Sequence, residues 1–138
     1  MQLRDIMKRD VISVFPDSTI TEAARMMEEH NIGCVLVVKD GQAKGILTDR
    51  DIVLKVIARG SDPTLTKTAD VMQPHVISAS PDTDILDASR LMTLHHVRRL
   101  PIQEAGQLLG IVSVMDLARV IQEEVDNLFS LRATPVYR

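Results

Sequence analysis

A hydroxyl residue followed three positions later by a carboxylate occurs twice in the sequence. Thr48 precedes Asp51 in the first phrase, and Ser113 precedes Asp116 in the second. In both phrases a glycine opens an apolar run, and the carboxylate falls where a helical pattern begins. We interpret the two phrases as ligand-binding sites. The same spacing is typical of a helix cap, in which the hydroxyl accepts a backbone N–H and the acid favours the positive helix end.

No catalytic or metal-binding constellation stands out in the sequence. It contains no Walker A lysine motif, no Gly-x-Gly-x-x-Gly and no nucleophile elbow. The carboxylates of the two phrases have no partner base in the sequence around them. His95 and His96 are adjacent, so on a helix they point about 100° apart and do not easily share a metal ion. We therefore expect no enzyme, no catalytic cofactor and no metal.

The whole chain is an internal duplication, and the two phrases are one part of it. When the chain is aligned with itself so that Asp51 falls on Asp116, further matches follow in one register without a gap. They are Val11-Ile12-Ser13 with Val76-Ile77-Ser78, Pro16-Asp17 with Pro81-Asp82, and Gly45-Ile46 with Gly110-Ile111. A helical repeat alone would not keep one register through strands, turns and helices. The sequence therefore predicts two copies of one folding unit.

The first unit predicts three strands and two helices. Thr19 and Glu22 form a capping-box pattern before an amphipathic stretch, and Asp40-Gly41 is a hairpin turn signal between two apolar runs. We expect a strand over 11–14, a helix ending near His30, strands over 34–38 and 43–47, and a helix from Asp49 to Gly60.

The second unit predicts the same order of elements. A strand over 76–78, a helix capped by Asp84, strands over 100–103 and 108–112, and a helix from about Val114 are expected. Leu117, Ile121, Val125 and Leu128 continue one apolar stripe, so this last helix should extend towards Phe129.

These elements predict an α/β (α+β) fold of two βαββα repeats. Neither repeat has enough core alone, so we expect the two to pack strand face to strand face with helices outside. The predicted division is a first domain over 3–60, a linker over 61–69, a second domain over 70–122, and a helix extension and tail over 123–138.

In this order of elements the sequence resembles a tandem pair of CBS domains over residues 3 to 122. The resemblance rests on the Asp-Ile-Met and Asp-Val-Met openings, the two Val-Ile-Ser strands, the segment from His95 to Ile102 and the two closing phrases. It implies a pseudo-twofold module with clefts between its halves. Such modules commonly bind AMP, ADP, ATP, S-adenosylmethionine or dinucleotides, regulate another protein, and often form homodimers through their helices.

The resemblance also implies which residues would bind the ligand. Ribose contacts fall on the two closing phrases, where a carboxylate can accept hydrogen bonds from two neighbouring hydroxyls. Adenine would meet the backbone of the two opening strands, and phosphate would meet an arginine pair with its guanidinium forks. The implied residues are Thr48, Asp51, Ser113 and Asp116 for ribose, Ile12, Ser13, Ile77 and Ser78 for adenine, and Arg98 and Arg99, followed by Leu100-Pro101, for phosphate.

The first repeat departs from this pattern, because Gly33-Cys34 occupies the place of Arg98-Arg99. We infer that at most one cleft binds a phosphorylated ligand well. The other would stay empty or take an uncharged adenosine moiety.

Composition limits the remaining function classes. A net charge of −3 supplies no basic field for nucleic acid, and no apolar run approaches the ~18 residues that span a bilayer. Cys34 is the only cysteine, which suits a reducing, cytoplasmic setting. We expect a cytoplasmic homodimer that senses an adenine-containing ligand and acts on a separate, unidentified protein. The alternative is a ligand-independent dimeric scaffold or docking protein.

Overall fold

The structure is a computed structural model, and it describes residues 1–132. Residues 133–138 of the predicted tail lie outside the described residues. The elements in chain order are η1 (Leu3–Asp5), β1 (Ser13–Val14), α1 (Ile20–His30), β2 (Cys34–Lys39), β3 (Gln42–Thr48), α2 (Asp49–Ile52), η2 (Val53–Ile57), η3 (Thr68–Asp70), α3 (Ile85–His95), β4 (Arg99–Glu104), β5 (Gln107–Ser113) and α4 (Val114–Arg132).

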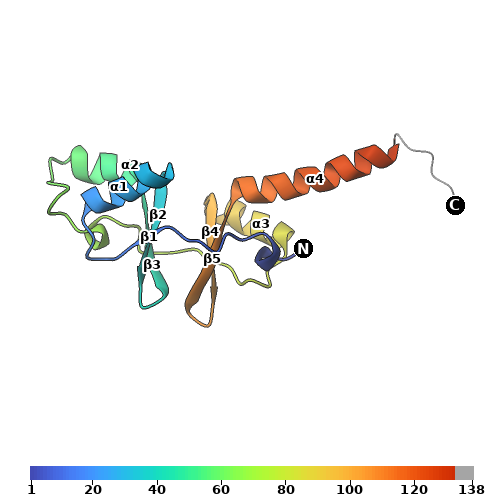
Figure 1. Cartoon of the computed structure of the whole chain (residues 1–138), viewed down its shortest axis with the longest axis horizontal. Helices are drawn as coiled ribbons and strands as arrows, with labels where there is room; N and C mark the ends of the chain where they lie inside the picture. The colour runs from blue at the N-terminus through green and yellow to red at the C-terminus, as the bar shows by residue number, and fades with distance from the viewer. Residues whose placement is uncertain (133–138) are drawn as a thin grey trace.

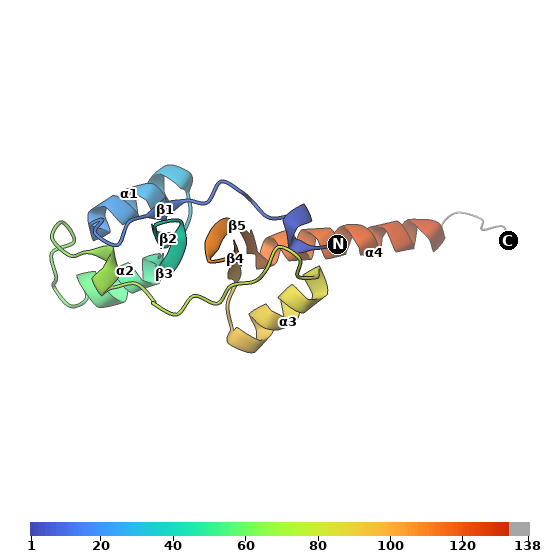
Figure 2. The ribbon, with the colours of Figure 1, turned by 90° about the horizontal axis from the view of Figure 1, so that it is seen from below.

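Two small sheets lie next to each other at the centre of the molecule, and the helices lie towards its two ends (Figures 1 and 2). The hairpins of the two sheets are linked by a hydrogen bond of 2.8 Å from the Leu108 N–H to the Gly41 carbonyl. This arrangement confirms the predicted α+β fold of two repeats. No helix within residues 1–132 combines the length and apolar character that a bilayer span requires.

The sheet of the first repeat has the order β1-β2-β3. β1 runs parallel to β2, with Ser13 opposite Leu36, and β2 pairs antiparallel with β3. The predicted hairpin turn is confirmed: Asp40 and Gly41 adopt φ angles of 54° and 74°, the left-handed pair that a two-residue hairpin turn requires. Only two residues of the predicted strand over 11–14 belong to β1.

The sheet of the second repeat has only β4 and β5, so the predicted strand over 76–78 is wrong. In the first repeat the Leu36 N–H donates to the Ile12 carbonyl. The equivalent residue in β4 is Pro101, which has no N–H to donate to Ile77. A single parallel bridge remains, in which Ala79 exchanges hydrogen bonds of 3.0 and 2.9 Å with Pro101 and Gln103.

The predicted helix caps are confirmed in both repeats. The Glu22 N–H donates to Thr19 Oγ1, and Glu22 accepts from the Thr19 N–H in return. Asp84 accepts from the Leu86 N–H at the start of α3. The second predicted helix begins at Asp49 as expected, but it continues as the π-helical turn η2.

The last helix, α4, is longer than any other element. Its 19 residues end at Arg132, three beyond the predicted Phe129. The helix extends away from the two sheets (Figure 1). Leu128 and Phe129 lie in this distal part, and both are exposed.

Each repeat has its own core, and a residue from the segment that precedes the other repeat in the sequence completes it. Leu3 is fully buried in the second core with Ile85, Leu100 and Leu117. In exchange, Val71 is buried in the first core, where Met72 packs against it. The predicted domain boundaries stay a prediction.

The crossing segments include Met7–Lys8, which lies across β5, and Met72–Gln73, which lies across β3. Two glycines allow these crossing segments to lie close to the sheets. A Cβ on Gly45 would come within 2.4 Å of Met72 Sδ and 2.9 Å of the Gln73 carbonyl oxygen. A Cβ on Gly110 would come within 2.7 Å of the Lys8 carbonyl oxygen, beside Met7. Next to the glycines, Ile46 and Gln73 exchange hydrogen bonds of 3.0 and 2.8 Å, and Ile111 and Lys8 exchange two of 2.9 Å. The two repeats are therefore interlocked.

Candidate functional site

Two clefts lie where the repeats meet, and they differ threefold in volume. The large cleft has a volume of about 590 Å³ and the small cleft about 190 Å³. Each is lined by the closing phrase of one repeat and the opening segment of the other. The large cleft is lined by Gly33, Cys34, Ile46, Thr48, Asp49, Arg50, Gln73, His75, Val76, Ile77, His96, Val97, Arg98 and Arg99. The small cleft is lined by Lys8, Asp10, Val11, Ile12, Ile32, Cys34, Leu36, Arg99, Ile111, Ser113 and Asp116.

The structure shows which of the predicted site residues share a cleft. Ile77, from the opening of the second repeat, lies with Thr48, from the closing phrase of the first. Ile12, from the opening of the first repeat, lies with Ser113 and Asp116. The clefts are therefore composite, because each opening segment borders the closing phrase of the other repeat where the two repeats meet.

In the first repeat the closing phrase forms a capping box. The Asp51 N–H donates to Thr48 Oγ1 at 3.1 Å, and the Thr48 N–H donates to Asp51 Oδ2 at 3.0 Å. Asp51 Oδ1 also lies 3.1 Å from Lys55 Nζ, and Gln73 Nε2 donates to Oδ2 at 3.2 Å. Asp51 is only 6% exposed and does not line the large cleft. Its carboxylate stabilises the start of α2.

Burial alone would raise the pKa of Asp51, but the surrounding donors outweigh it. The backbone N–H of Thr48, the Lys55 ammonium, the Thr48 hydroxyl and the Gln73 amide all favour the charged carboxylate. The pKa of Asp51 is therefore lower than the ordinary value of an aspartate.

The closing phrase of the second repeat has the same box, and its carboxylate is similarly buried, with Asp116 8% exposed, but it lines a cleft. The Asp116 N–H donates to Ser113 Oγ at 3.1 Å, and the Ser113 N–H donates to Asp116 Oδ2 at 2.9 Å. Lys8 Nζ lies 3.8 Å from Asp116 Oδ1. Asp116 and Ser113 both line the small cleft, so this carboxylate can reach a ligand as well as cap α4.

Arginine side chains reach both clefts, which differs from the one-sided distribution that the sequence predicts. Arg98 lines the large cleft, as predicted, together with Arg50. Arg99 lines the large cleft and the small cleft. Lys8 adds a second cation to the small cleft.

Some predicted site residues lie away from the cleft walls. Ser13 is paired in β1, Pro101 is buried in β4, and Ser78 does not line either cleft. Their roles in binding stay predictions. Sequence reasoning missed Asp10 and His75, which are equivalent residues of the two repeats and line opposite clefts. The signal was available, since both directly precede the repeated Val-Ile-Ser segments.

Within residues 1–132, no group of three or more histidine, cysteine, aspartate or glutamate side chains could hold a metal ion. Cys34 is buried between the clefts. Burial raises the pKa of its thiol, although the nearby Arg99 guanidinium acts in the opposite direction. The absence of a metal stays a prediction.

Comparison with known proteins decides the family. The CBS domain model matches residues 3–58 and again residues 69–123. The chain belongs to the CBS domain family. Its two matches make it a tandem CBS pair, as the internal duplication indicates.

Curated relatives agree with this assignment. The CBS domain-containing protein YhcV of Bacillus subtilis is 45% identical over 116 residues, which cover 84% of this chain and 82% of YhcV. Hypoxic response protein 1 of Mycobacterium tuberculosis is 36% identical over 121 residues, covering 87% of this chain and 85% of that protein. Two further relatives are longer, and the chain spans 60% of each.

Solved CBS structures share the fold. The crystal structure of Hypoxic Response Protein I with two coordinated zinc ions has a TM-score of 0.79 and covers 86% of this chain and 98% of that chain. The CBS domain pair of protein MJ0100, in complex with 5′-methylthioadenosine and S-adenosyl-L-methionine, has a TM-score of 0.78 at 25% identity. It covers 90% of this chain and 98% of that chain.

The lowered pKa of Asp51 predicts a pH-dependent contribution to stability. Below about pH 4 the unfolded chain binds a proton at this site more readily than the folded chain does, so the contribution is lost as pH falls through the folded pKa. We expect Asp51→Asn to lower the free energy of unfolding by about 1–3 kcal/mol at pH 7, because it weakens charge-assisted hydrogen bonds. Urea unfolding at a series of pH values measures the difference.

The difference between Asp51→Asn and the unsubstituted protein should shrink steadily between pH 5 and pH 2. Asp126→Asn, on the exposed face of α4, is the control and should change stability by less than about 0.5 kcal/mol at pH 7. A cost of Asp51→Asn that stays constant across this pH range would contradict the role assigned to the carboxylate.

Proposed function

We propose that this protein is a non-catalytic regulatory module that binds an adenosine-containing ligand between its CBS repeats and acts on a separate protein. The composite clefts carry the proposal, because a ligand in either one contacts both repeats. Such a ligand can favour one arrangement of the repeats by its difference in affinity for the two. The relation to CBS proteins, which are generally regulatory, supports this function over catalysis.

The lining of the small cleft suits a nucleoside. Ser113 and Asp116 offer a hydroxyl and a charged acceptor to a pair of ribose hydroxyls. Ile12, Ile32 and Ile111 supply apolar surface for a flat base, without any aromatic ring. The MJ0100 pair, a structural relative bound to two adenosine compounds, supports the same ligand class here.

The large cleft suits a ligand that also carries phosphate. Arg50, Arg98 and Arg99 line it, and guanidinium groups bind phosphate oxygens in pairs. Its volume of about 590 Å³ exceeds that of the small cleft, which has room for less. The candidate ligands are therefore AMP, ADP, ATP, S-adenosylmethionine or a dinucleotide, with phosphate preferred in the large cleft.

A ligand-independent docking protein is the second candidate, and the capping boxes favour it. Both closing phrases are satisfied without any ligand, and the Asp51 carboxylate is occupied by Lys55 and Gln73. A protein of this kind would use the phrases only as helix caps.

Thermal unfolding in the presence of ligand separates the two candidates. We expect adenosine, AMP, ADP, ATP or S-adenosylmethionine at 100 times its dissociation constant to add about 2.7 kcal/mol to the free energy of unfolding. Guanosine and GMP are the controls for base recognition. A chain that none of the adenosine compounds stabilises would be a docking protein.

Substitution of the two carboxylates distinguishes ligand contacts from caps. We expect Asp116→Ala to weaken adenosine binding about tenfold or more, since it removes a charged acceptor from the small cleft. Asp51→Ala is the matched variant and should mainly lower stability, by about 1–3 kcal/mol. Unchanged adenosine affinity in Asp116→Ala, with only a loss of stability, would make that phrase a cap alone.

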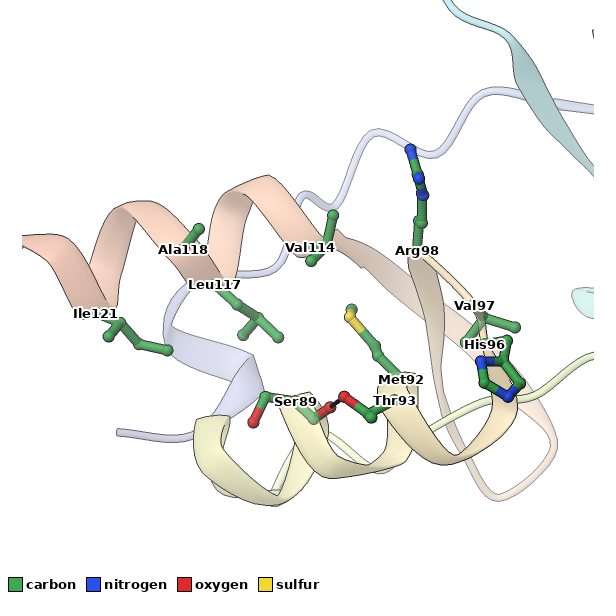
Figure 3. Close-up of a pocket in the computed structure, with 10 residues that line it drawn as sticks. All are labelled: Ser89, Met92, Thr93, His96, Val97, Arg98, Val114, Leu117, Ala118 and Ile121. Atoms are coloured by element: carbon green, nitrogen blue, oxygen red, sulfur yellow. Dashed lines mark hydrogen bonds between the residues drawn. The ribbon is translucent and has the colours of Figure 1, made fainter.

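A homodimer is the assembly that we propose, with α4 at its interface. An apolar groove of about 460 Å³ lies between α3 and the first half of α4, lined by Met92, Val97, Leu117 and Ile121 among others (Figure 3). On the distal half of the same helix, Val125, Leu128 and Phe129 are exposed. In an antiparallel α4 pair, the distal half of each helix would cover the groove of its partner. One twofold axis therefore buries both surfaces.

Charge substitution on α4 tests this dimer. We expect Leu128→Glu to shift the protein from dimer to monomer at micromolar concentration, because a charge would be buried in an apolar interface. Met115→Glu is the control, because Met115 is also exposed but lies about 140° around the helix. Sedimentation equilibrium measures both, and equal dimerisation of the two variants would contradict the interface.

A further inference from the structure

Of all the residues that line the two clefts, two line both of them: Cys34 and Arg99. They occupy equivalent positions in the internal duplication, one in each repeat. Cys34 is the first residue of β2 and pairs with Thr48, and Arg99 is the first residue of β4 and pairs with Ser113. This position therefore lies on the pseudo-twofold axis, between the clefts.

The two residues at this position differ in what they offer a ligand. The Cys34 side chain is buried and carries no charge that could bind phosphate. Arg99 is exposed, and within residues 1–132 it forms none of the ion pairs that other cations make. The single guanidinium group at this position, that of Arg99, therefore lies within reach of both clefts.

The other cations belong to one cleft each. Lys8 lines the small cleft, where it lies 3.8 Å from the Asp116 carboxylate. Of the two clefts, Arg50 and Arg98 line only the large one. A guanidinium presents its N–H donors in one rigid plane at the end of a single side chain. When Arg99 turns a pair of donors towards a phosphate in one cleft, that pair is directed away from the other cleft.

We propose that the two clefts share Arg99, so that a phosphate-bearing ligand in one cleft weakens the binding of a second in the other. This inference rests on the proposed binding of adenosine compounds in these clefts. The coupling is reciprocal, as linkage requires, and it applies to AMP but not to adenosine. At a typical coupling strength, the second AMP binds about tenfold more weakly than the same cleft binds AMP alone.

Closing one cleft at a time tests the sharing directly. His75 lines only the large cleft and Asp10 only the small one, and both are exposed equivalents. His75→Trp leaves the small cleft open, and Asp10→Trp leaves the large cleft open. Titration calorimetry with AMP and with adenosine gives the affinity of each open cleft, with Arg99 present and with Arg99→Ala.

We expect Arg99→Ala to weaken AMP about tenfold in both single-cleft variants and to leave adenosine unchanged. The control is Arg98→Ala, which should weaken AMP only where the large cleft is open. In the protein with both clefts open, the second AMP should bind about tenfold more weakly than AMP binds to the corresponding single-cleft variant.

The outcomes separate this inference from the proposed function. Loss of AMP affinity in one single-cleft variant alone would overturn the sharing of Arg99 and leave the proposed function standing. Equal affinities for adenosine and AMP would also overturn the sharing of Arg99 and leave the proposed function standing. Failure of every variant to bind AMP or adenosine would overturn the sharing of Arg99. Failure of the unsubstituted protein to bind any of the adenosine compounds named above would overturn the proposed function as well.

Cys34→Arg tests the inference without a tryptophan, and Cys34→Ser is its control. The Cys34→Arg substitution places a second guanidinium at the equivalent position on the axis, so that each cleft has its own guanidinium. We expect the second AMP to bind about tenfold more tightly than in the Cys34→Ser protein. Unchanged binding of the second AMP by a folded Cys34→Arg protein would overturn the shared arginine.

Discussion

Close contact between two crossing segments and two glycines is the constraint on which the rest of the structure depends. The segment before each repeat lies across β3 or β5 at a distance that leaves no room for a Cβ on Gly45 or Gly110. Paired backbone hydrogen bonds hold each crossing in place. Because Leu3 and Val71 are then buried in opposite cores, neither repeat retains its core without the other segment.

The clefts follow from this interlocking. The opening segment of each repeat stays with its own repeat, as β1 does beside β2, but it borders the closing phrase of the other repeat. Ile77 therefore lies with Thr48, and Ile12 lies with Asp116. The duplication makes the two clefts equivalent in position. A few residues that differ between the repeats give the two clefts different chemistry. Pro101 removes one ladder bond and thereby the third strand of the second sheet, and arginine replaces cysteine at one end of the axis.

Local features of this fold were predictable from the sequence, and long-range ones were not. The Thr19–Glu22 box and the Asp40-Gly41 turn depend on residues a few positions apart, so their pattern is sufficient. The family resemblance implied clefts between the repeats. Nothing near Lys8 or His75 in the sequence indicates which repeat each contacts, so the residues that share each cleft were not predicted. Asp51 shows a different limit: spacing placed it correctly in a capping box, but only packing reveals that Lys55 and Gln73 also hold its carboxylate.

The central claim is that one ligand contacts both repeats in a composite cleft. Two-dimensional NMR of the labelled protein, titrated with AMP to saturation, tests it most directly. The account predicts that amide signals from Thr48–Arg50 and from His75–Ile77 shift together, with one dissociation constant. Shifts confined to a single repeat, or confined to the helices while both segments stay unperturbed, would contradict it.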